Sequence, residues 1–204
     1  MESAGSSARR APAVGRGNKM RAAVLEATVT ELAETGYAAL TVEGVARRAG
    51  VHKTTIYRNW TNPDGLVVDA LVSHFAADIP IPHTGTAEGD LRALARSLVA
   101  TMTTQAGRAL LVTVLSDAVR IPQLAEVKRA LFDDRFRRAE PVVTRAVERG
   151  ELPADTDPAE LLKALAAPVY FRLVFTGEPV DEATADRAVN VALAAAHAGA
   201  LQAV

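Results

Sequence analysis

The sequence predicts an all-α fold of about nine helices, and three observations support this prediction. Apolar residues recur at helical spacing along most of the chain, and no stretch alternates strictly between apolar and polar residues as a half-buried strand would. Glycine and proline fall between the periodic segments, where helices are expected to end or begin. Nearly half of the 204 residues (49%) are apolar but only 4% are aromatic, so that much of the core must consist of Ala, Val and Leu.

The first predicted helix follows an irregular N-terminal segment. Residues 1–17 are rich in Gly, Ala, Ser and Arg without any period, and we expect a flexible basic arm. A helical pattern begins at Asn18 and ends at Gly36, because glycine readily adopts the left-handed conformation that terminates helices. Three apolar residues share one face of this helix: Leu25, Val29 and Leu32.

Two short helices are predicted next. Thr41 is a suitable N-cap for a second helix over residues 42–49, whose apolar positions follow the spacing i, i+3, i+4, i+7, and Gly50 ends it. A third helix is expected from about Lys53 to Trp60, with Ile56 and Trp60 facing inward.

The remaining helices are predicted from their start and stop signals. Asn62, Pro63 and Asp64 provide an N-cap, a proline at the first position and an acid in the first turn, so that a fourth helix should run through Phe75. Residues 79–90 are a loop by composition. Further helices are expected at about 90–106, 108–119, 122–149, 157–175 and 181–201.

The second and third helices, joined by a glycine turn, form the pattern of a helix-turn-helix. At about 100° per residue, the polar residues of the third helix lie away from Ile56 and Trp60. Thr54, Thr55 and Arg58 point most directly outward, flanked by Lys53, Tyr57 and Asn59. Such side chains suit base edges and phosphates in a major groove, although any exposed helix also carries polar residues.

Two residues at helix starts add to this candidate DNA-binding set. Thr41 can cap its helix and also present backbone amides to a phosphate. His52 can cap the third helix, reach a phosphate, or do neither.

The charge distribution favours the same end of the chain. Residues 1–62 carry nine Lys or Arg and five Glu, a net charge of +4, whereas the remainder has 14 basic and 19 acidic residues, a net charge of −5. A basic front on an acidic body indicates that only the front meets a polyanion such as DNA. A DNA-packaging protein indifferent to sequence is disfavoured, because the overall charge is only −1.

The segment TGYAALTVEGVARRAGVHKTTIYRNW, residues 35–60, resembles the DNA-binding segment of the tetracycline-repressor (TetR) family of bacterial regulators. The resemblance implies that the residues matching Lys53, Thr54, Thr55 and Tyr57 touch bases and phosphates, and that the residue matching Thr41 touches a phosphate. HTGTAEGDLRALARSLVA, ERGELPADTDPAELL and PVYFRLVFTGEP resemble one of the family's C-terminal domain types, so that the resemblance covers roughly residues 18–200.

Two positions depart from the family's pattern. His52 stands where the family often has Ser or another small residue, and Pro63 replaces a common Lys that contacts phosphate. Proline has no N–H to donate, which puts one phosphate contact per subunit in doubt. Arg9, Arg10 and Arg16 could replace it by entering the minor groove, or the arm could remain an unbound tail.

The last two predicted helices are candidates for a dimer interface. ELLKALAAPVYFRLVFTG is apolar on nearly every face and must be covered on all sides, while the alanines of ADRAVNVALAAAHAGAL allow close helix approach. We expect them to form a four-helix interface across a two-fold axis, as the family resemblance also implies, although an intramolecular core helix is the alternative. A homodimer would place two helix-turn-helix motifs about 34 Å apart, suited to a palindromic operator.

The C-terminal part should also bind a small, largely apolar molecule. Pro168 is expected to interrupt its helix, and a kink there could open a cavity. Arg172 lies among apolar residues and needs a carboxylate, a carbonyl, solvent or a ligand as its partner. Other candidate pocket residues, each of which could equally be plain core, are Phe75, Met102, Phe132, Phe136, Tyr170 and Val174.

Several other functions are disfavoured. The chain has no cysteine, no secretory signal pattern and no run of 18 apolar residues, so we expect a cytoplasmic protein that does not enter a membrane. Its four histidines show no metal-binding spacing, and no metal or cofactor is expected. Asp133 and Asp134 stand beside Arg135, Arg137 and Arg138, which favours a solvated ion-paired face over a catalytic pair.

We therefore predict a ligand-responsive DNA-binding transcriptional regulator rather than an enzyme. It should bind a palindromic operator as a homodimer, and repression is favoured because most relatives of the resembled family repress. Residues 1–17 would form the arm, 18–62 the helix-turn-helix domain and 63–204 the ligand-binding and dimerisation domain. The alternative is a helical small-molecule-binding protein or enzyme without sequence-specific DNA binding.

Overall fold

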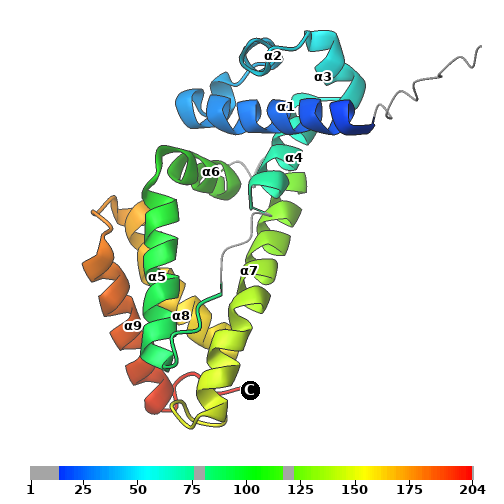
Figure 1. Cartoon of the computed structure of the whole chain (residues 1–204). Coiled ribbons are helices and arrows are strands. Elements are labelled where there is room, and N and C mark those ends of the chain that lie inside the picture. Colours follow the sequence, from blue (N-terminus) through cyan, green and yellow to red (C-terminus); the bar gives the residue numbers. More distant parts are fainter. Residues whose placement is uncertain (1–13, 76–80, 117–121, 204) are drawn as a thin grey trace, which may run out of the picture.

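The computed structural model describes residues 14–75, 81–116 and 122–203. Over these ranges the chain forms nine α-helices and no strand, which confirms the predicted all-α class. Three N-terminal helices form a small unit at one end, and α4 leads from it into a longer helical body (Figure 1).

The N-terminal unit contains α1 (Val14–Thr35), α2 (Val42–Ala49) and α3 (Lys53–Asn59). The Thr41 hydroxyl accepts a 3.0 Å hydrogen bond from the Gly44 amide and caps α2, as predicted. Gly50 ends α2 with φ of 67°, a left-handed conformation that suits glycine. Helix α1 starts four residues before the predicted Asn18. Gly15 and Gly17 therefore lie inside the helix although glycine has a low helix propensity.

The fourth helix, α4 (Pro63–Phe75), joins the two parts of the molecule. The Asn62 side-chain oxygen accepts a 2.7 Å hydrogen bond from the Gly65 amide, which confirms the predicted cap. One face of α4 supplies Leu66 and Ala70 to the core of the N-terminal unit. An adjacent face of α4 supplies Val67 and Leu71 to a second cluster, here called the junction core, which consists of Leu32, Val67, Leu71, Leu110, Val114 and Leu124.

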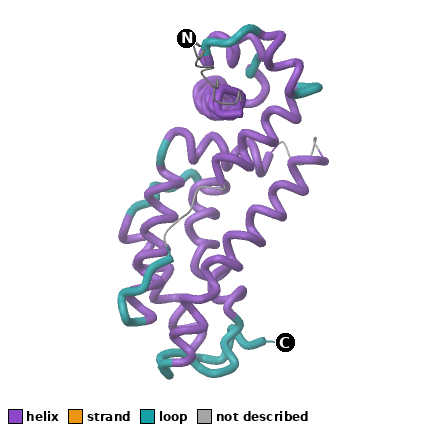
Figure 2. The backbone as a smooth tube through the Cα atoms, turned by 45° about the vertical axis from the view of Figure 1, so that its right-hand side comes forward, coloured by secondary structure: helices purple, strands orange, loops and turns teal. Residues whose placement is uncertain are grey.

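The body contains five α-helices: α5 (Ala87–Thr103), α6 (Gln105–Ser116), α7 (Pro122–Glu148), α8 (Pro158–Phe171) and α9 (Glu182–His197). Helix α6 lies across one end of the body beside α1, while α5, α7, α8 and α9 run along its length (Figures 1 and 2). Their apolar faces enclose a third core built largely from Leu, Val and Ala, as the composition predicts.

Two prolines lie inside helices of the body. α7 continues through Pro141, and α8 continues through Pro168 to Phe171. Pro168 therefore does not end its helix. Instead, α8 passes into a wider π-helical segment, η3 (Arg172–Thr176), which ends at Gly177.

Within the described ranges, no single helix is long and apolar enough to cross a membrane. Only α5 and α6 taken together reach the required length and composition, and these two helices are bent by 88° relative to each other.

Candidate functional site

The outward face of α3 is the first candidate site. Ile56 and Trp60 are buried beneath the helix, as predicted, at 1% and 6% exposure. Tyr57 is 50% exposed, so it is not part of the core and its ring and hydroxyl are accessible at the surface. The other exposed polar residues of the predicted set on this segment are His52, Lys53, Thr54, Arg58 and Asn59.

Thr55 and Asn59 differ from the simple helical projection. Thr55 is half-buried, so it does not point fully outward as its position on the helical wheel predicts. The Asn59 side-chain amide donates a 2.7 Å hydrogen bond to the Thr55 carbonyl, an interaction one turn back along the helix. In the free protein this amide therefore caps backbone at the end of α3.

The residues at the start of α3 are arranged as surface groups. His52 occupies the N-cap position with extended backbone, but its side chain makes no capping hydrogen bond. Lys53 forms an exposed ion pair with Glu43 of α2, with 3.3 Å between Nζ and Oε1. A hydrogen bond to its own backbone, followed by the hydrogen bond and charge of Lys53, lowers the pKa of Glu43.

Polar contacts attach α2 to α1, and the end of α3 to α4. Arg48 of α2 donates to Glu31 of α1 at 3.1 Å and also binds Glu34. The Asp69 carboxylate of α4 accepts hydrogen bonds from the Trp60 indole at 2.9 Å and from Arg21 of α1 at 2.7 Å. These contacts fix the orientation of α3 relative to α1 and α4.

Most of the predicted basic arm lies outside the residues that the structure describes. Arg9 and Arg10 lie outside the described residues, whereas Arg16 belongs to the range of α1 and not to an irregular arm. Pro63 begins α4, as predicted.

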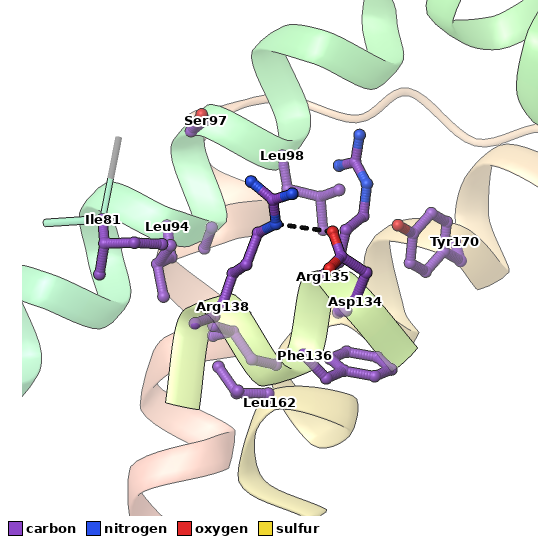
Figure 3. A pocket seen from close by; sticks show the side chains of 14 residues that line it. Ile81, Leu94, Ser97, Leu98, Asp134, Arg135, Phe136, Arg138, Leu162 and Tyr170 are labelled. Atoms are coloured by element: carbon purple, nitrogen blue, oxygen red, sulfur yellow. Dashed lines mark hydrogen bonds and ion pairs between the residues drawn. The ribbon is translucent and has the colours of Figure 1, made fainter. Parts of the chain in front are cut away.

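The second candidate site is a cavity in the body with a volume of about 110 Å³. It lies between α5, α7 and α8, with Ile81 at its edge (Figure 3). Most of the wall is aliphatic, from Leu94, Leu98, Leu162, Leu165 and Ala166. The polar part of the wall comes from Ser97, Asp134, Arg135, Arg138 and Tyr170.

A smaller cavity of about 10 Å³ lies next to the first, and Arg135 and Tyr170 line both. Its other walls are Met102 of α5, Leu111 and Val114 of α6, and Leu131 and Phe132 of α7. Val114 also belongs to the junction core, where it packs in one cluster with Val67 and Leu71 of α4. The two cavities thus lead from the centre of the body towards the helix that carries the N-terminal unit.

Four of the predicted pocket residues line these cavities. Phe136 and Tyr170 line the larger one, whereas Met102, Phe132 and again Tyr170 line the smaller one. Phe132 and Tyr170 meet edge to face, with ring centroids 5.5 Å apart. The Phe75 side chain lies outside what the structure describes.

Arg172 and Val174 belong to η3 and do not contribute to either described cavity wall. Arg172 instead forms a 2.8 Å ion pair with Glu178. This ion pair gives Arg172 the carboxylate partner that its position among apolar residues requires, and its role in ligand binding stays a prediction.

Arg135 is the site residue that sequence reasoning missed. Asp134 binds Arg138 (Figure 3) and also Arg137, which confirms part of the predicted ion-paired face. Arg135, assigned to the same solvated face, is instead half-buried and lines both cavities. In sequence, the signal was its position next to Phe132 and Phe136, the two aromatic residues on the inward face of α7.

Burial governs the electrostatics around Arg135. Burial lowers the pKa of the Arg135 guanidinium, and the nearby Tyr170 and Asp134 oppose this shift. Burial raises the pKa of the Tyr170 hydroxyl, which Arg135 opposes. Burial, followed by the charge of Arg135, lowers the pKa of His74 in the last turn of α4. The charge of Arg135 therefore affects a titratable group on α4, the helix that joins the two parts of the molecule.

Among the described residues, no group of three His, Cys, Asp or Glu side chains is arranged to hold a metal ion.

The fold and the polar face of α3 define a helix-turn-helix DNA-binding protein with a helical C-terminal domain. A family model described as "Bacterial regulatory proteins, tetR family" matches residues 24–70. A second, described as "Tetracyclin repressor-like, C-terminal domain", matches residues 81–192. The chain belongs to the TetR family of transcription regulators, which are DNA-binding proteins and not enzymes.

Individual relatives agree with this assignment. The HTH-type transcriptional regulator AqdR of Rhodococcus erythropolis is 31% identical over 179 residues, which cover 87% of this chain and 86% of the relative. The DNA-binding transcriptional repressor TetR of Mycobacteroides abscessus is 31% identical over 183 residues, covering 87% and 93%. The crystal structure of the TetR family transcription regulator SCO0332 matches with a TM-score of 0.67 and 34% identity, covering 86% and 97%.

Proposed function

We propose that this regulator binds a palindromic operator as a homodimer and is released by a small, largely apolar molecule. The observation that carries the proposal is the pair of connections made by α4. One face of α4 packs in the core beneath α3, and an adjacent face packs in the junction core that borders the smaller cavity. A molecule that enlarges the cavities would therefore move the helix that sets the position of α3.

In this proposal, α3 lies in the major groove. Lys53, Thr54, Tyr57 and Arg58 would contact bases and phosphates, and Thr41 would contact a phosphate at the start of α2. Thr55, Asn59 and His52 complete the proposed set, with Asn59 leaving its hydrogen bond to the backbone when it meets DNA.

The proposed homodimer uses the last two helices. Phe171 and Phe175 are 56% and 77% exposed and stack on each other, and Val191 of α9 is 60% exposed. A stacked pair of exposed aromatic residues is typical of an interface. Two copies would place two α3 helices about one turn of DNA apart.

The proposed division of the chain assigns α1–α3 to DNA and residues 63–204 to ligand binding and dimerisation, with residues 1–17 as a basic arm whose last part belongs to α1. Repression is supported by the M. abscessus relative, which is named a repressor. We expect the regulator to act in the cytoplasm, where bacterial operators lie.

A gel-shift titration with the DNA upstream of the protein's own gene tests the proposal. We expect retardation that only unlabelled DNA of the same sequence competes away, and release by a ligand that fits the cavity. Retardation that unrelated DNA competes equally well would contradict operator recognition. If several small molecules bind in the body of the protein but none of them changes its affinity for the operator, the proposed release would be contradicted.

A further inference from the structure

Two consecutive arginines near the end of α2, Arg47 and Arg48, have different surroundings. The Arg48 guanidinium turns towards α1, where it binds the carboxylates of Glu31 and Glu34. Arg47 is exposed, and its guanidinium forms no hydrogen bond or ion pair within the part of the chain that the structure describes. Successive side chains leave a helix about 100° apart, so Arg48 can attach α2 to α1 while Arg47 points elsewhere.

Arg47 lies on the face of α2 that is next to the start of α3. Glu43 stands one turn earlier, about 6 Å along the helix, and residues at i and i+4 are neighbours on one face. The Glu43 carboxylate forms an ion pair with Lys53, the first residue of α3, with 3.3 Å between Nζ and Oε1. The face that carries Glu43 and Arg47 therefore adjoins the start of α3, in the unit at the end of the molecule away from the body (Figure 1).

The charges on this surface leave two arginines without a carboxylate partner. A Glu four residues before an Arg suits an ion pair within a helix, but Glu43 binds Lys53 instead of Arg47. Arg58 of α3 is also exposed and forms no ion pair with any described residue. Lys53 and Glu43 balance each other, so the exposed surface of α2 and α3 keeps the positive charges of Arg47 and Arg58.

We propose that Arg47 binds a DNA phosphate beside the major groove that α3 enters. The inference rests on the proposed function, because it requires α3 to lie in that groove. In helix-turn-helix proteins the helix before the recognition helix crosses the DNA backbone, which brings the exposed face of α2 close to phosphates and not to bases. A guanidinium binds a phosphate through two parallel hydrogen bonds, and Arg47 has no described ion pair to break when it does so.

Operator binding by full-length variants at several salt concentrations tests this contact. Arg47→Met should lower the affinity about tenfold or more at about 0.1 M salt, and it should reduce the slope of log affinity against log salt by about 0.9 per subunit, because fewer counterions are released. Arg108→Met is the matched control, since Arg108 on α6 of the body is equally exposed and has no ion pair among the described residues. It should keep the wild-type slope. An unchanged slope in Arg47→Met, or an equal reduction in both variants, would overturn the inference.

Two further variants show that the charge at this position is the cause. Arg47→Lys should keep most of the wild-type slope, because lysine also neutralises a phosphate as a point charge. A reduction as large as that of Arg47→Met would count against the phosphate contact. If the methionine variant fails to fold, Arg47→Gln removes the same charge and should show the same reduction in slope.

Ethylation interference separates a direct contact from a general effect of charge, because an ethylated phosphate carries no negative charge. We expect one phosphate in each half-site at which ethylation weakens binding by the wild type but not by Arg47→Met. The same interference pattern for both proteins would overturn the assigned contact.

Unrelated DNA separates this inference from the function on which it rests. A phosphate contact reads no sequence, so Arg47→Met should weaken binding to the operator and to unrelated DNA by similar factors. A loss confined to the operator would refute the phosphate contact. Wild-type protein that binds both DNAs equally, with a reduced slope in Arg47→Met, would refute operator recognition and retain the contact. An unchanged slope together with wild-type specificity would retain the proposed function and refute the role of Arg47.

Discussion

The Trp60 indole nitrogen donates a 2.9 Å hydrogen bond to the Asp69 carboxylate, which ties the end of α3 to the middle of α4. Asp69 also binds Arg21 of α1, whose guanidinium lies 5.8 Å from the Trp60 ring centroid. The three side chains connect α3, α1 and α4. Any movement of α4 would therefore be transmitted to α3 through polar contacts as well as through the core.

This relationship predicts that Asp69→Ala destabilises the protein by about 1–2 kcal/mol, because the buried indole N–H loses its acceptor. The loss of stability should lie near the lower end of this range, since the Asp69 side chain is 40% exposed and water can replace part of the contact. Chemical unfolding followed by fluorescence of Trp60, the chain's single tryptophan, measures this directly. Arg21→Ala removes a half-exposed ion pair and the contact with the Trp60 ring but leaves the indole N–H with its acceptor, so it should cost less than Asp69→Ala. A larger loss for Arg21→Ala than for Asp69→Ala would refute this explanation.

The ion pair between Lys53 and Glu43 predicts opposite effects of two substitutions on DNA binding. Lys53→Ala should weaken operator binding and reduce the slope of log affinity against log salt by about 0.9 for each phosphate that the protein no longer neutralises. Glu43→Gln should bind at least as tightly as the wild type, because it removes a negative charge near the DNA and a competitor for Lys53. Fluorescence anisotropy at several salt concentrations measures both. Weaker binding by Glu43→Gln would count against the proposed orientation of α3.

The exposed aromatic pair predicts a dimer that a single charge disrupts. Phe175→Glu should raise the dimer dissociation constant by about tenfold or more, because it places a charge in an apolar interface. Sedimentation at a series of protein concentrations measures the constant. Val112→Glu is the control, since Val112 is an exposed apolar residue of α6, away from the last two helices. A wild-type protein that stays monomeric, or an equal effect of both substitutions, would refute the proposed interface.

His74 predicts a specific pH dependence of stability. Its pKa is lowered in the folded protein by burial and by Arg135, so the unfolded chain binds its proton more readily. Stability should therefore fall as the pH drops below about 6.5, the ordinary pKa of histidine. His74→Gln should show a shallower fall in this range when unfolding is measured from pH 7.5 to pH 5.5. A steeper fall in the variant would contradict the assigned direction.

Local signals in the sequence predicted the helix-turn-helix well. The caps at Thr41 and Asn62, the left-handed Gly50 and the inward Ile56 each depend on residues within a few positions of one another. Backbone capping and helical periodicity act over such distances, which is why these elements could be predicted without tertiary information.

The cavity could not be predicted in the same way. Its walls come from α5, α7 and α8, which are far apart in the chain, and the orientation of each helix depends on the packing of the others. Arg135 follows two aspartates and precedes more arginines, a pattern typical of a solvated face, and only the packing of α7 shows that it turns inward. The ion pair between Arg172 and Glu178 likewise depends on the course of η3 and the loop after it, which helical periodicity does not predict.

The most direct test of the central claim is methylation interference on the operator fragment retarded by the wild-type protein. Methylation at guanine N7 modifies the major groove, whereas methylation at adenine N3 modifies the minor groove. If the outward face of α3 lies in the major groove in both subunits, guanine methylation should block binding in two half-sites centred about 34 Å apart. Interference confined to adenine N3, or limited to a single half-site, would contradict the account.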